Sequence, residues 1–146
     1  MNAPLYNNEI LRLAAAAPFS ERLPDPMASV EKRSPICGSR VTVDLNVDAA
    51  GRVTDIGLLV RACALGQASA SILGGAVLGR SLAELAQGRA QLRALLDGAG
   101  NPPATPFDAL EIFTPAVPHR ARHASILLAW DAVVEAVQQA TGSAAA

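Results

Sequence analysis

The sequence predicts an α+β fold, in which a small antiparallel sheet of about three strands carries helices packed mainly on one face. The first sign is residues 40–48, which alternate strictly between apolar and polar side chains, as in a half-buried strand. The second is the turn chemistry of residues 48–51, which is followed by another strand-like segment at residues 52–60. These two segments predict a central hairpin over residues 40–60, which forms the core of the predicted sheet. The third sign is helical periodicity on both sides of this hairpin.

The residues before the hairpin predict one helix and one long loop. Apolar residues recur at helical intervals in residues 5–17, and Asn7 or Asn8 is available to cap the first turn. Residues 18–39 contain four prolines and mixed charges, so we expect an ordered loop with a short edge strand near residues 28–32.

The residues after the hairpin predict further helices. Small side chains fill residues 64–79, where Gly74 and Gly75 require close tertiary packing for a helix to be stable. Ser81 and Glu84 have the spacing of a capping box, which predicts a helix over residues 82–96 that Gly88 interrupts.

The last part of the chain predicts two more helices. Pro106 suits the first position of a short helix that extends to Phe113. Apolar residues at helical spacing in residues 120–140 predict a final helix that packs on the sheet, followed by a frayed tail from about residue 141. We expect residues 1–146 to form a single domain.

Charge and hydropathy exclude two classes of partner. The chain of 146 residues has a net charge of −1, which gives no electrostatic reason to expect nucleic acid or an anionic membrane. No apolar run reaches the roughly 18 residues of a membrane span, and the amino terminus lacks the pattern of a signal peptide. We therefore expect a cytoplasmic protein.

The two cysteines, Cys37 and Cys63, flank the predicted hairpin. Because antiparallel strands bring their outer ends together, we expect the two thiols to share one site. Cys63 also directly precedes a predicted helix, and a helix amino terminus stabilises the thiolate, which is the form that binds metal or accepts sulfur. The alternative is that both cysteines are small buried hydrophobic residues.

Several motifs occur in order along the chain: LYNNEIL at 5–11, PICGSRVTVDL at 35–45, GRVTDI at 51–56, CALGQASAS at 63–71 and RHASILLAW at 122–130. With these motifs the sequence resembles the iron-sulfur cluster assembly scaffold family, which includes IscU, SufU and the amino-terminal domain of NifU. The additional helical residues 82–113 resemble the SufU branch more than the shorter IscU branch. The resemblance implies a fold of the SufE/NifU type and a scaffold rather than an enzyme.

The resemblance also implies a set of ligands that this sequence completes only in part. In members of the family, four groups converge on one metal ion or cluster. They are a thiol in a CGD motif, the aspartate of that motif, a second thiol before the small-residue helix and a third thiol at the start of the last helix. Cys37 and Cys63 match the first two thiols, and Ser39 stands at the aspartate. The third thiol falls on Ser125 or on Ala124, depending on the alignment.

On the alignment that uses Ala124, His123 matches the histidine that precedes the third cysteine of the family. A tetrahedral zinc or iron site takes about four donors, and we expect Cys37, Cys63 and His123 to supply three of them. His119 is four residues away from His123, but it follows a proline and is more simply a solvated loop residue.

The sequence thus predicts a scaffold-like protein of iron-sulfur cluster assembly, which binds iron or zinc, or accepts sulfur from a cysteine desulfurase, through Cys37 and Cys63. Since the aspartate and the third thiol are replaced, the sequence is also compatible with a protein that binds no cluster and no metal ion. The alternative function is a non-catalytic interaction or regulatory module that kept the fold and lost the chemistry. A thiol redox enzyme is less well supported, because the cysteines form no CxxC pair.

Overall fold

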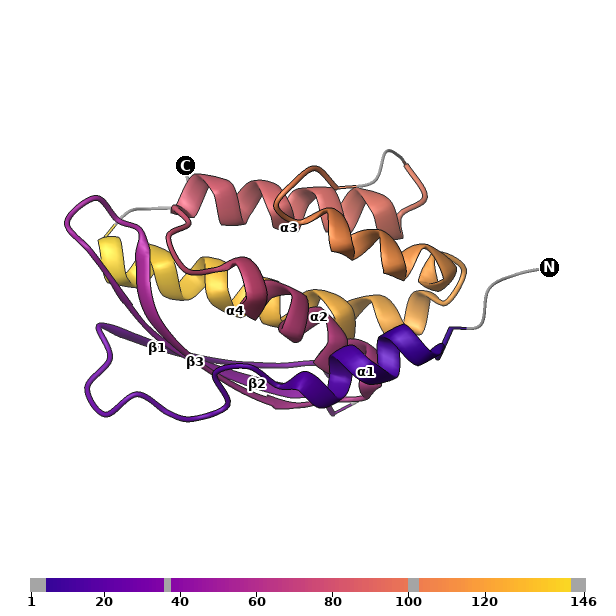
Figure 1. Cartoon of the computed structure of the whole chain (residues 1–146), viewed down its shortest axis with the longest axis horizontal. Coiled ribbons are helices and arrows are strands. Elements are labelled where there is room, and N and C mark those ends of the chain that lie inside the picture. Colours follow the sequence, from indigo (N-terminus) through magenta and orange to yellow (C-terminus); the bar gives the residue numbers. More distant parts are fainter. Residues whose placement is uncertain (1–4, 36–37, 100–102, 143–146) are drawn as a thin grey trace.

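The computed structural model of the chain describes residues 5–35, 38–99 and 103–142, so Cys37 lies outside the described residues. Three strands, β1 (Ala28–Arg33), β2 (Arg40–Val47) and β3 (Val53–Arg61), form an antiparallel sheet in the order β1-β2-β3. The helices lie on one face of this sheet (Figure 1). The predicted α+β fold is confirmed.

The hairpin of β2 and β3 has the predicted turn. The side chain of Asp48 accepts hydrogen bonds from the backbone N–H groups of Ala50 and Arg52, at 2.9 and 3.0 Å. Gly51 has a φ of +79°, which a glycine adopts at no steric cost. The alternating pattern is confirmed as well, because Val41, Val43 and Leu45 are all buried against the helices.

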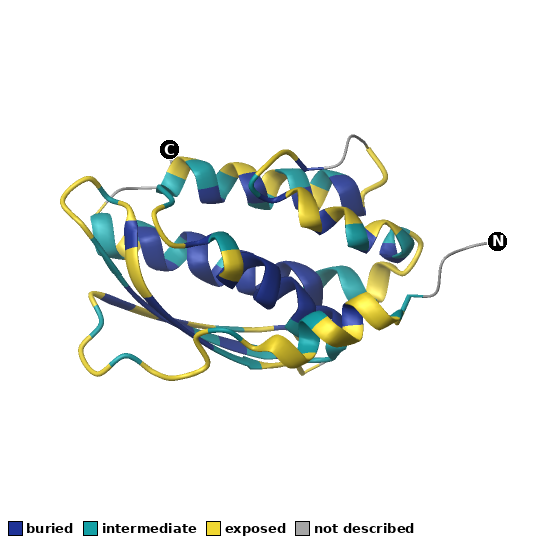
Figure 2. Cartoon of the chain, viewed as in Figure 1, coloured by how far each residue is buried: buried dark blue, intermediate teal, exposed yellow. Residues whose placement is uncertain are grey.

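The described residues form four α-helices and two 3-10 helices: α1 (Asn8–Ala16), α2 (Ala64–Ala76), α3 (Leu82–Leu96), η1 (Asp108–Ala116), η2 (Arg120–Arg122) and α4 (His123–Thr141). Helix α4 lies between the sheet and α3, while α2 packs on α4, on β3 and on α1. Buried residues accordingly dominate α2 and α4 (Figure 2).

The caps of two helices are as predicted. The side chain of Asn7 accepts a hydrogen bond from the N–H of Ile10 at 2.9 Å, and Ser81 and Glu84 form a reciprocal capping box. The expected interruption at Gly88 does not occur. A Cβ added to Gly88 would lie 2.7 Å from the Phe107 ring and 2.8 Å from the Trp130 ring, so the glycine serves close packing inside a continuous helix.

The expected short helix from Pro106 to Phe113 is present, but it begins and ends later than predicted and is of the 3-10 type. A 3-10 helix, η1, begins at Asp108 and continues through Pro115 to Ala116. Phe107 is buried and packs edge-on against Trp130 at a centroid distance of 4.9 Å, which anchors the chain before the helix begins. Proline lacks the donor that a longer α-helix needs, and this favours short 3-10 turns.

The final helix also begins later than predicted, because residues 120–122 form the separate turn η2 and α4 starts at His123. Two serines fix α4 and α1 against α2. The hydroxyl of Ser69 donates to the carbonyl of Ile126 at 2.6 Å, and that of Ser71 donates to the carbonyl of Leu13 at 2.6 Å. The Ser69 bond holds the start of α4 against α2, and thus beside Cys63.

Candidate functional site

Cys63 lies at the junction of β3 and α2. It is the N-cap residue of α2 with an extended backbone, and its side chain makes no capping hydrogen bond. The thiol is free and half-buried. The predicted position of this thiol at a helix amino terminus is confirmed.

Two serines from distant parts of the chain lie beside this thiol. The Oγ of Ser125, in the first turn of α4, is 3.5 Å from the Sγ of Cys63. The Oγ of Ser39, directly before β2, is 3.1 Å from the Oγ of Ser125. Both serines are buried, at 3% and 2% exposure. We call Ser39, Cys63 and Ser125 the serine-thiol cluster.

Glycines allow the backbone to form this cluster. A Cβ added to Gly66 would lie only 2.7 Å from the Oγ of Ser125, so a glycine is needed for α4 to approach α2 this closely. Gly38 has a φ of +71°, and its N–H donates to the carbonyl of Ser34 at 3.2 Å. The N–H of Ser34 donates in turn to the carbonyl of Ser39 at 2.8 Å, which fixes Ser39 beside β1.

The geometry distinguishes the two alignments of the third ligand. Ser125, rather than Ala124, faces Cys63 and Ser39. The ring of His123 lies against η1, where its Nε2 is 2.8 Å from the carbonyl oxygen of Ala116. The sequence does not reveal these directions, since they depend on where α4 begins. Ligation by His123 stays a prediction.

The distances between the side chains of the serine-thiol cluster suit a tetrahedral metal ion, but two of its three donor atoms are poor ligands. Bonds of about 2.0 to 2.3 Å put neighbouring ligand atoms of a zinc site roughly 3.3 to 3.8 Å apart. The separations of 3.5 and 3.1 Å are close to that size. A neutral hydroxyl, however, is a weak ligand beside a carboxylate or thiolate. In the described residues no group of three or more His, Cys, Asp or Glu side chains is placed to hold a metal ion.

The residues predicted from the sequence thus have different outcomes. Cys63 lies in the cluster, His123 is turned toward η1, and Cys37 is outside the described residues. The hydrogen bond between Ser39 and Ser125 was not foreseen, and the small residues around Gly66 were its main sign in the sequence. None of the helices in the described ranges is long and apolar enough to cross a membrane.

Comparisons with known proteins agree with this architecture. The family model of the NifU-like N terminal domain matches residues 17–145. A structure of a nitrogen-fixing NifU-like protein (N-terminal) from Brucella abortus is 38% identical, with 96% of each chain covered and a TM-score of 0.91. A comparison with curated proteins found no match.

A second solved structure shares the fold at lower identity. It is a putative iron-sulfur cluster assembly scaffold protein for the SUF system from Fervidobacterium islandicum, which is 18% identical, covers 91% of this chain and 96% of its own, and has a TM-score of 0.82. This identity shows the fold alone, so the SufU-like branch stays a prediction. The family model and the 38% identical structure show that the chain belongs to the NifU-like N-terminal domain family.

Proposed function

We propose that the protein is a cytoplasmic scaffold of iron-sulfur cluster assembly, not an enzyme, and that it carries its cargo at Cys63 and Cys37. The main support is the convergence of Ser39, Cys63 and Ser125 on one point, at distances close to those between metal ligands, in a chain of this family. The cargo is iron, zinc or sulfur, and a cysteine desulfurase is the proposed sulfur donor.

Sulfur transfer to Cys63 follows from ordinary thiol chemistry. The Cys63 thiolate attacks the outer sulfur of a donor persulfide, the bond between the two donor sulfurs breaks, and the donor leaves as a thiolate. Cys63 is the N-cap residue of α2, so the attacking sulfur belongs to the residue at the amino-terminal end of that helix. The Ser125 hydroxyl, 3.5 Å away, is close enough to donate a hydrogen bond to this sulfur. This step needs no metal ion.

Metal binding requires more of the site. Cys63 and Cys37 supply two thiolates, while Ser39 and Ser125 present neutral hydroxyls. We propose His123 as a third ligand, in which case either its Nδ1 binds or its Nε2 leaves the Ala116 carbonyl. We therefore expect this site to bind a metal ion more weakly than a complete set of thiolate and carboxylate ligands does.

A second candidate function is an interaction module that carries no cargo. The observation that favours it is the hydrogen bond between Ser39 and Ser125, because a hydrogen bond between two buried hydroxyls stabilises the cluster without an ion. Such a protein would bind the same assembly partners and regulate them.

The experiment compares the wild type with Cys37→Ser, Cys63→Ser and the double variant after anaerobic purification. Metal analysis and native mass spectrometry measure bound iron and zinc. Mass spectrometry after incubation with a cysteine desulfurase and cysteine measures persulfide. His123→Ala tests the third ligand, with His119→Ala as the matched control.

Loss of metal or persulfide in the cysteine variants supports the cargo function. Metal and persulfide levels that are unchanged in both variants contradict it. The interaction module is favoured by two results together. The wild type carries neither metal nor sulfur, and the desulfurase binds the double variant as well as it binds the wild type.

A further inference from the structure

Three arginines stand side by side across one end of the sheet. Arg33 of β1 is directly opposite Arg40 of β2, and Arg40 is directly opposite Arg61 of β3. Directly opposed residues of antiparallel strands lie on the same face. With neighbouring strands about 4.8 Å apart, these residues span roughly 10 Å. We call Arg33, Arg40 and Arg61 the arginine row.

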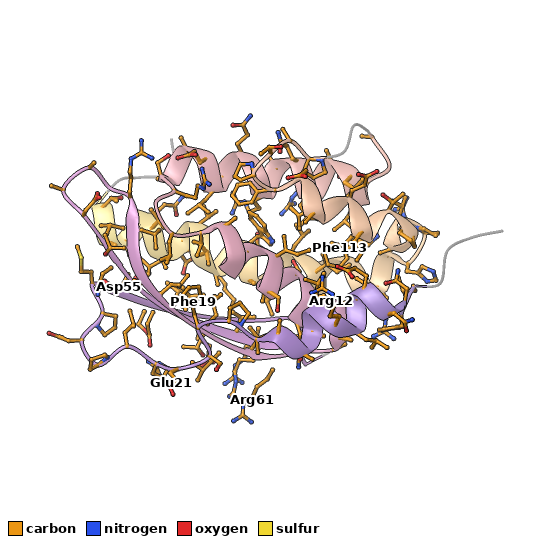
Figure 3. The ribbon with its side chains drawn as sticks, viewed as in Figure 1. Arg12, Phe19, Glu21, Asp55, Arg61 and Phe113 are labelled. Carbon is orange, nitrogen blue, oxygen red and sulfur yellow. The ribbon has the colours of Figure 1, made fainter. Side chains whose placement is uncertain are left out.

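The arginine row lies on the face of the sheet that the helices leave open. Val41 is buried against the helices, so its neighbour Arg40 points to the other face. Arg33 and Arg61 are exposed, and Arg40 is half-buried. Figure 3 shows Arg61 on the side of the sheet away from the helices. A partner can therefore reach all three side chains from one direction.

Only part of this charge is balanced. Glu31 forms an ion pair with Arg33 at 2.8 Å. The hydrogen bond from Arg33 holds the pKa of Glu31 below its usual value, against the smaller effect of burial. Among the residues that the structure describes, neither Arg40 nor Arg61 has an ion-pair partner within 4.0 Å. The charge of Arg40 also contributes to the lowered pKa of Glu31, but the row still sets three positive charges against this one acid.

Like charges directly opposite each other destabilise a sheet, and here two such pairs lie in line. No buried contact requires a guanidinium at the exposed positions 33 and 61. We propose that the arginine row is a docking surface for an acidic segment of a partner protein, whose carboxylates relieve this repulsion. Nucleic acid fits less well, since the whole chain has a net charge of −1 and three arginines neutralise few phosphates.

The position of the row gives this docking a consequence. Arg40 directly follows Ser39, and Arg61 lies two residues before Cys63. A segment bound to the row is therefore held at the end of the sheet that carries the serine-thiol cluster. The link to cargo transfer rests on the proposed function, whereas the docking itself requires neither metal nor sulfur.

The test uses a fluorescein-labelled, glutamate-rich dodecapeptide as the probe, with fluorescence anisotropy at low ionic strength. The row variant carries Arg33→Gln, Arg40→Gln and Arg61→Gln. The control variant carries Arg12→Gln, Arg52→Gln and Arg93→Gln, which removes the same charge from exposed arginines elsewhere. We expect the row variant to bind about tenfold more weakly or worse, and the control to stay within about twofold of the wild type.

Melting curves show whether the variants are folded, and Arg40→Gln alone is expected to raise the melting temperature by about 1 to 4 °C, because it removes both like-charge pairs. Equal loss of affinity in the row and control variants overturns the inference. Tighter binding of a single-stranded oligonucleotide through the row overturns the assignment to an acidic protein.

The same assay with Cys63→Ser separates the two proposals. Docking that persists in Cys63→Ser while metal and persulfide loading are lost supports both. Docking that persists although the wild type carries no cargo leaves the inference standing without the proposed function. If the wild type binds metal or forms persulfide but does not bind the peptide, the docking inference is wrong and the proposed function stands alone.

Discussion

The hydroxyl of Ser125 lies 3.5 Å from the thiol of Cys63, although 62 positions separate the two residues in the sequence. This contact joins the first turn of α4 to the amino terminus of α2. Ser39 extends it from a third part of the chain, 3.1 Å from Ser125. Three segments therefore bring their side chains to one point, and what this point binds depends on the atoms that these positions carry.

Ser39→Asp combined with Ser125→Cys is expected to turn the serine-thiol cluster into a strong metal site. The backbone already holds these positions near ligand spacing, so the change replaces two weak donors by a carboxylate and a thiolate. We expect affinity for Zn²⁺ to rise by about 100-fold or more, measured by competition with a chromophoric chelator.

The matched control for this variant is Ser20→Asp combined with Ala99→Cys, which adds the same groups at two exposed positions. An equal rise in Zn²⁺ affinity in the control, or no rise in the cluster variant, would show that the cluster does not act as a latent metal site.

Gly66→Ala is expected to destabilise the protein and to disturb the cluster. The added Cβ would lie 2.7 Å from the Oγ of Ser125 and 2.8 Å from the Cβ of Ala62, so α2 and α4 must separate. We expect the free energy of unfolding to fall by about 1 to 3 kcal/mol in urea denaturation. Gly75→Ala, in the same helix with no atom within 4 Å of the new Cβ, should instead stabilise by about 0.5 to 1 kcal/mol. Equal effects of the two substitutions would contradict this account.

The sequence predicted the elements that local chemistry determines. The alternation in residues 40–48 identified β2, and the capping residues Asn7 and Ser81 marked the starts of α1 and α3. Cys63 was correctly placed at the start of α2. Each of these predictions depends on residues within one or two turns of each other.

Features that depend on distant contacts were not predictable in this way. Asp44 lies on the polar side of β2, but the loop before β1 folds over it and buries it completely. The register between β1 and β2, which aligns Arg33 with Arg40, has no signal in the long loop before it. The side chain that faces Cys63 likewise depends on the start of α4, which the sequence placed three residues too early.

Arg22→Gln is expected to reduce stability, because it removes the main partner of the buried Asp44 carboxylate. The Nε of Arg22 lies 2.6 Å from Oδ2 of Asp44, and Ser29 and the Leu23 N–H also donate to this carboxylate. We expect the midpoint of urea denaturation to fall at pH 7, because the buried carboxylate loses one of its hydrogen-bond donors. Arg12→Gln, which breaks an exposed pair with Glu9, should lower this midpoint much less.

The effect of Arg22→Gln should depend on pH. Burial opposes the ionisation of Asp44, but the hydrogen bonds from Arg22, Ser29 and the Leu23 N–H outweigh it and hold the pKa of Asp44 below its usual value. The resulting stabilisation is complete above the ordinary range for aspartate, near pH 4, and is lost as the pH falls through the folded-state pKa. The gap between wild type and variant should therefore narrow below about pH 4. A gap that stays constant to pH 2 would mean that Arg22 acts through packing alone.

Asp131→Asn is expected to raise the stability of the protein at pH 7, whereas Arg22→Gln lowers it. Burial raises the pKa of Asp131 and outweighs the attraction of Arg89, Arg93 and Lys32. The folded state thus holds a proton that the unfolded chain has already released, so ionised Asp131 lowers stability above the ordinary aspartate range, and this penalty disappears as the pH falls.

The side chain of Asp131 is 33% exposed, and its nearest cation, Arg89, is 3.6 Å away, so the effect is modest. We expect Asp131→Asn to stabilise the protein by on the order of 0.5 kcal/mol at pH 7, with no difference from the wild type near pH 3, in parallel melting curves. Asp25→Asn, at an exposed position, is the control and should change stability little. A lower melting temperature of Asp131→Asn at pH 7 would mean that the ion pairs to α3 outweigh the cost of burying this carboxylate.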